Sequence, residues 1–122
     1  MTSQTEPLAK HVHLELWGVN EDVLNDPQRL EQILKNAAAA ARCEVLGSVA
    51  HQFQPQGASV VVLVAESHLS IHTWPERQYA AADILTCGNT LPEAGVRSIV
   101  AELLPASWST EIYNRGVTPL KK

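Results

Sequence analysis

The chain has 122 residues, a length that predicts one compact domain spanning residues 1–122. Its 45% hydrophobic and 18% charged residues are typical of a globular protein, and its formal net charge of −4 excludes the strongly basic surface that nucleic-acid binding requires. The start of the chain lacks the pattern of a secretion signal and no segment reaches the roughly 20 apolar residues of a membrane span, so we expect a cytoplasmic protein with no nucleic-acid or membrane partner.

In the first half of the chain, alternating and apolar patterns predict three strands. They cover residues 11–17, 43–53 and 60–65. A helix lies between the first two strands, because Asp26 and Pro27 form a helix-start signal and apolar residues then recur at helical spacing as far as Ala41. The third strand is apolar throughout, which predicts that both of its faces are buried.

In the second half, strand patterns cover residues 69–74, 79–86 and 108–115. A helix precedes the last of these, because Thr90 and Glu93 have the spacing of a capping box and the apolar pattern that follows ends at Pro105. The predicted order is β-α-β-β-β-α-β, with the region around Ser67 the least defined. Such a chain buries its apolar faces as an α+β fold, a two-layer α/β sandwich in which two helices cover one face of a mainly antiparallel sheet.

The segment Glu66–Glu76 is rich in serine, histidine and carboxylate side chains and directly follows the apolar strand. Exposed strand faces carry such residues routinely, so their presence alone does not establish a site. Zinc binding by His68 and His72 is disfavoured, because residues four apart on a strand lie about 13 Å apart. A hydrolytic nucleophile is weakly supported, because Ser67 lacks the flanking glycines of a nucleophile elbow. Autocatalytic backbone cleavage at a serine is the third alternative.

The same segment resembles the signature block of the short-chain prokaryotic S-adenosylmethionine decarboxylase proenzymes. The block consists of Glu66–Glu76, Tyr79-Ala80-Ala81, Asp83 and Thr86-Cys87-Gly88, and a looser similarity extends from about His11 to Gly116. In that family the residue that matches Ser67 attacks its own preceding carbonyl, and the chain is cut between Glu66 and Ser67. The resemblance therefore implies a β chain of residues 1–66 and an α chain of residues 67–122 that begins with a pyruvoyl group.

The resemblance also assigns roles to other residues. Ser59 and His72 match residues that assist self-cleavage, as an oxyanion donor and a proton acceptor. The pyruvoyl ketone forms a Schiff base with the substrate amine and accepts electrons as carbon dioxide leaves, without metal. Cys87 matches the acid that then protonates the substrate, Phe53 a ring that stacks on adenine, and Glu76 a carboxylate that binds the ribose hydroxyls. From the residues alone, Phe53 also fits a core position and Ser59 a turn.

The implied reaction converts S-adenosylmethionine to the aminopropyl donor of spermidine synthesis, in a homodimer with sites at the subunit interface. Arg77-Gln78 stands where Tyr-Gly is usual in the family. A cationic side chain near the site would disfavour a cationic substrate, so the identity of the substrate is in question. The same chemistry on arginine or ornithine is therefore an alternative, although Phe53 and Glu76 favour a nucleoside. A further alternative is an unprocessed homologue with a binding or regulatory role.

Overall fold

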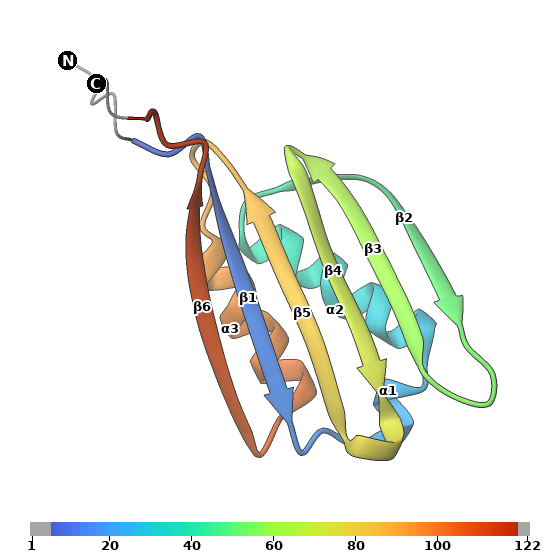
Figure 1. Ribbon diagram of the computed structural model, residues 1–122. Helices are drawn as coiled ribbons and strands as arrows, with labels where there is room; N and C mark the ends of the chain where they lie inside the picture. Colours follow the sequence, from blue (N-terminus) through green and yellow to red (C-terminus); the bar gives the residue numbers. More distant parts are fainter. Residues whose placement is uncertain (1–5, 120–122) are drawn as a thin grey trace.

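The computed structural model describes residues 6–119, which form one six-stranded antiparallel sheet with helices on one side (Figure 1). The strand order is β2-β3-β4-β5-β1-β6. The elements in chain order are β1 (Ala9–Trp17), α1 (Glu21–Leu24), α2 (Pro27–Ala40), β2 (Glu44–Gln52), β3 (Ala58–Ala65), β4 (Ser67–Trp74), the 3-10 turn η1 (Pro75–Arg77), β5 (Tyr79–Thr86), α3 (Pro92–Leu103) and β6 (Ser107–Arg115).

The predicted two-layer α+β fold is confirmed, and each of the six predicted strand segments corresponds to a strand, but the order β-α-β-β-β-α-β counts one strand too few. Four strands, not three, lie between the two long helices. Val64 pairs with Ser67, so the chain turns through Ala65 and Glu66 in a two-residue hairpin loop that connects β3 to β4. The turn η1 then reverses the chain between β4 and β5. The short helix α1 was not predicted, because four residues carry no helical periodicity.

The two predicted helix starts had different outcomes. Asp26 caps α2 as expected, since its side chain accepts a hydrogen bond from the backbone N–H of Arg29 at 3.1 Å. The predicted capping box of α3 is wrong: Leu91 is the N-cap residue and no side chain caps the helix. Pro92 occupies the first helical position and moves the helix start one residue past Thr90.

The core lies between the sheet and the helices α2 and α3, which contact each other and cover the strands β1 to β5. Alternate residues of β1, including Val12, Leu14 and Leu16, point into this layer and are almost fully buried. Gly95 permits the close approach of α3, because a Cβ at that position would lie 3.0 Å from Ile84 Cδ1. None of the helices in residues 6–119 has the length and hydrophobicity of a membrane span.

The opposite side of the sheet, which we call the open face, is covered by no helix within the described residues (Figure 1). Strand β3 was predicted to be buried on both faces, but its open-face side chains Val61 and Leu63 are 41% and 53% exposed. Val49 of β2 lies beside Val61 and is more exposed still. The apolar pattern of β3 therefore provides more apolar surface than one chain buries.

Candidate active site

The hairpin between β3 and β4 places Ser67 at one end of the sheet. Ser67 pairs with Thr86, the last residue of β5. Cys87 follows Thr86 in the chain and therefore lies beside the Glu66–Ser67 bond. The Cys87 thiol is 3.9 Å from the carbonyl oxygen of Glu66 and 3.4 Å from its side-chain Oε1. We call Glu66, Ser67 and Cys87 the cleavage end. The fold thus brings a thiol to the carbonyl that the family resemblance marks for attack.

The cleavage end favours a protonated thiol at Cys87. The hydrogen bond to the Glu66 side chain, burial and the negative charge of Glu66 all raise the pKa of Cys87 above its ordinary value. A thiol held in the protonated form can donate a proton to a neighbouring carbanion or oxyanion. The second cysteine, Cys43, is buried and unpaired, as expected for a small core residue.

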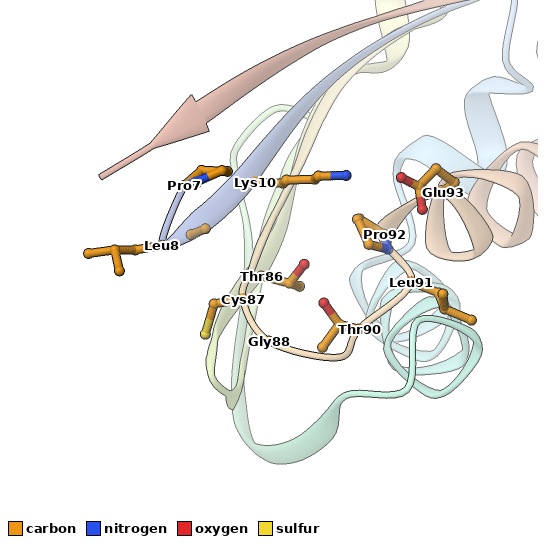
Figure 2. Close-up of a pocket in the computed structure, with 11 residues that line it drawn as sticks. Pro7, Leu8, Lys10, Thr86, Cys87, Gly88, Thr90, Leu91, Pro92 and Glu93 are labelled. Carbon is orange, nitrogen blue, oxygen red and sulfur yellow. The ribbon is translucent and has the colours of Figure 1, made fainter. Parts of the chain in front are cut away.

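A polar pocket of about 280 Å³ adjoins Cys87 at the same end of the sheet (Figure 2). Its lining includes the side chains of Lys10, Thr86, Thr90 and Glu93. The Thr86 hydroxyl is fully buried and has no hydrogen-bond partner among the described residues. A buried hydroxyl in a polar pocket is a common position for an ordered water.

Ser59 and His72 form a pair at the other end of the open face. They are cross-strand neighbours on β3 and β4, and Ser59 Oγ lies 2.7 Å from His72 Nδ1. Ser59 was open to interpretation as a turn residue, but it belongs to a strand. A hydroxyl hydrogen-bonded to an imidazole can orient that imidazole for proton transfer.

Phe53 and Glu76 lie next to this pair. They line one pocket of about 460 Å³ with Ser59, His72 and Trp74. The volume lies in the range of small-ligand sites. Phe53 is 46% exposed, so it is not a core residue. Phe53, Ser59, His72 and Glu76 are called the pocket end below.

Arg77 does not line the pocket, although it adjoins Glu76 in the chain. Its side chain is exposed. The next residue, Gln78, adopts a left-handed conformation with a φ of 53°, which glycine adopts without steric cost. The structure therefore accommodates the departure at 77–78 without changing the lining of the pocket.

The cleavage end and the pocket end are not in contact within one chain. Ser67 begins β4 and His72 lies five residues further along the strand, which corresponds to about 16 Å. The seven predicted site residues are therefore brought together as two groups. This separation was not visible in the sequence, where the residues fall close together.

A third group of side chains lies between the two ends and was not predicted as part of the site. The carboxylate of Asp83 is hydrogen-bonded to Ser70, to His11 Nε2 at 2.5 Å and to His68 Nε2 at 3.0 Å. His11, His68 and Asp83 are also the one set among the described residues with ligand atoms close enough for a metal ion. The histidine pair considered from the sequence, 68 with 72, does not form this group.

The comparisons with known proteins agree with one another. The family model described as S-adenosylmethionine decarboxylase matches residues 10–116. An S-adenosylmethionine decarboxylase proenzyme of Pelotomaculum thermopropionicum is 43% identical over 113 residues, covering 92% of this chain and 90% of the relative. The proenzyme of Carboxydothermus hydrogenoformans is 45% identical over 111 residues, covering 90% of this chain and 87% of the relative.

A solved structure has the same fold. The crystal structure of the adenosylmethionine decarboxylase from Aquifex aeolicus aligns with a TM-score of 0.85 and 32% identity, covering 96% of this chain and 98% of that chain. The family model spans most of the chain, and relatives above 40% identity extend over nine-tenths of it. The resemblance seen in the sequence is thus confirmed, and the chain belongs to the S-adenosylmethionine decarboxylase family.

Proposed function

We propose that this protein decarboxylates S-adenosylmethionine after cutting its own backbone between Glu66 and Ser67. The observation that carries the proposal is the contact of the Cys87 thiol with the carbonyl and side chain of Glu66, at the bond that family membership marks for cleavage. Two residues 21 positions apart meet there. The proposed products are the two chains 1–66 and 67–122.

The residues at the cleavage end fit the formation of a pyruvoyl group. Ser67 carries the hydroxyl that would attack the Glu66 carbonyl, and it follows an exposed two-residue loop. The thiol of Cys87 is within reach of the carbonyl oxygen. The chemistry supplied there would be that of a ketone, an acceptor for the electrons released by decarboxylation. Cys87, with its raised pKa, is the proposed proton donor to the substrate.

The pocket end fits a nucleoside. Phe53 offers a partly exposed ring for stacking, and the Glu76 carboxylate can accept two hydrogen bonds from neighbouring hydroxyls. Its negative charge also favours a sulfonium cation. Since Arg77 does not line this pocket, the like-charge objection to a cationic substrate is removed.

The 16 Å separation of the two ends supports a homodimer with shared sites. Ser59 and His72 lie on the open face, and the open face also carries exposed Val49, Val61 and Leu63. A twofold axis that runs parallel to the open face and perpendicular to the strands would place the cleavage end of one copy over the pocket end of the other. His72 and Ser59 of one copy would then assist cleavage at Ser67 of its partner, and apolar side chains of both copies would be buried.

The experiment measures carbon dioxide release and chain mass on the same purified protein. We expect two fragments that meet at Glu66 and Ser67, and release of carbon dioxide from S-adenosylmethionine but not from arginine or ornithine. Release from arginine or ornithine alone would contradict the proposed substrate and leave the chemistry intact. A single uncut species without activity would favour the unprocessed binding or regulatory homologue.

A further inference from the structure

The group around Asp83 connects the cleavage end to the neighbouring strands. We propose that Asp83 is a positioning residue that fixes the first residues of β4, and with them the reactive group formed from Ser67. This inference rests on the proposed function. We call Asp83, His11, His68 and Ser70 the Asp83 cluster.

The contacts place this cluster at the start of β4. Ser70 lies directly opposite Asp83 on the neighbouring strand, and its hydroxyl donates a hydrogen bond to Oδ1. His68 follows Ser67 in the chain and bonds to Oδ2 at 3.0 Å. A single carboxylate thus holds two of the first four residues of β4. His11 bonds to the same Oδ2 from β1, on the other side of β5.

The hydrogen-bond directions follow from Arg115. Its guanidinium is only a donor, and its Nη1 lies 3.0 Å from Nδ1 of His11. Nδ1 therefore accepts, so the hydrogen of a neutral His11 is on Nε2 and is donated to Asp83. Burial raises the pKa of Asp83, but the hydrogen bonds from Ser70, His11 and His68 outweigh burial and lower it below its ordinary value. Asp83 is thus an ionised acceptor at neutral pH.

This arrangement argues for positioning rather than metal binding. A histidine that ligates a metal through one ring nitrogen donates a hydrogen bond from the other, usually to a carboxylate or carbonyl. On His11 the second nitrogen instead accepts from the cationic Arg115, which also repels a metal cation. The two imidazoles and the carboxylate satisfy one another without an ion.

The cluster becomes more important once the chain is cut. In the uncut chain, residue 67 is held from both sides by the backbone, whereas after cleavage it is a chain terminus. Chain ends are poorly ordered unless they are tied down. The side chain nearest the new terminus is His68, and Asp83 holds it. Since a displacement of about 1 Å at a reacting group can lower a rate about 100-fold, loss of this contact is expected to slow turnover.

The test compares Asp83→Asn, His68→Leu and the double variant with the parent protein. We expect full cleavage and full ketone content, measured by mass and by reaction with phenylhydrazine. We also expect kcat to fall by about 10- to 100-fold and KM to change by less than about twofold. The double variant should be no slower than the worse single variant, because both changes break the same hydrogen bond between His68 and Asp83. His68→Gln keeps a donor and should recover most of kcat.

Asp22→Asn is the matched control, since it makes the same chemical change at an exposed carboxylate on α1, on the helix side of the sheet, and should keep full activity. Full kcat in Asp83→Asn would overturn the inference. A loss of kcat that is fully explained by a lower ketone content would overturn it as well. Stoichiometric zinc uptake by the parent that Asp83→Asn abolishes would overturn it in favour of a metal site. Absence of a ketone in the parent would instead contradict the proposed function, so the two failures are distinguishable.

Discussion

The two ends of strand β4 differ in what they can do alone. The cleavage end has a nucleophile, Ser67, and a thiol acid, Cys87, but within the described residues no imidazole base bonds to Ser67. The pocket end has the imidazole of His72, with Ser59 beside it and a ligand-sized pocket, but no residue that could become the reactive group. The comparison teaches that each end lacks what the other supplies, about 16 Å away on the same strand. A complete site is therefore expected only where two copies meet.

The largest effect is expected when the cleavage end is mutated in one chain and the pocket end in another. Ser67→Ala alone should stay uncut and inactive, and His72→Ala alone should cut and react about 10²- to 10⁴-fold more slowly. When the two variants are co-expressed, each mixed dimer contains one intact pair of ends, so activity should return. Mass analysis should find the cut in the chains that carry His72→Ala.

No recovery on co-expression would show that both ends act within one copy. Normal cleavage of His72→Ala without a partner would remove His72 from processing. The first outcome would contradict the homodimer with shared sites, and the second would contradict the role of His72, although the family membership would stand in both cases.

Cys87→Ala separates cleavage from decarboxylation. We expect this variant to be cut and to carry the ketone, but to decarboxylate about 10²- to 10⁴-fold more slowly, because the proposed proton donor is lost. Cys43→Ala is the control, since Cys43 is buried in the core and should affect stability rather than turnover. Full turnover by Cys87→Ala would exclude Cys87 from the mechanism.

Phe53→Ala tests the pocket end alone. Stacking of a base on an aromatic ring contributes about 1–3 kcal/mol, so KM for S-adenosylmethionine should rise by about 5- to 150-fold while cleavage is unaffected. Trp108→Ala removes another partly exposed aromatic residue, on the helix side of β6 and away from the open face, and should leave KM unchanged. An unchanged KM in Phe53→Ala would mean that the nucleoside does not bind at the pocket end.

The smallest effect concerns the thiol at the cleavage end, measured in the uncut Ser67→Ala background. The hydrogen bond and charge of Glu66 raise the pKa of Cys87, so less thiolate is present at any pH below that pKa. Glu66→Gln removes the charge and should lower the pKa. Alkylation by iodoacetamide at pH 8 should therefore become faster by a few-fold. A slower or equal rate would show that Glu66 does not control the thiol.

Much of the fold could be predicted because its signals are local. The alternation of residues 11–17 and the cap at Asp26 depend on neighbours in the chain, and the structure confirms both. The strands β4 and β5 were also predicted, but the turn η1 between them was not, because it has no strong signal and Gln78 stands at the left-handed position where the family has glycine. The prediction that both faces of β3 are buried is wrong for a single chain, because Val61 and Leu63 are exposed. The same apolar pattern is consistent with a face that a second copy covers.

The candidate site was predicted as a set of residues, whereas its arrangement in space was not. Family resemblance marked Ser67, Ser59 and His72, yet strand register places Ser59 opposite His72 and both far from Ser67. The Asp83 cluster was missed because Asp83 and His11 are 72 residues apart, and only the position of β1 beside β5 brings them together. Tertiary pairing, rather than composition, decides both features.

The central claim is tested most directly by the intact mass of the purified protein, recorded with and without a carbonyl reagent. We predict two species, residues 1–66 and residues 67–122, with the second lighter by one ammonia than a serine-terminated fragment and increased in mass by phenylhydrazine. A single full-length species that does not react with the reagent would contradict self-cleavage at Ser67 and with it the proposed decarboxylase.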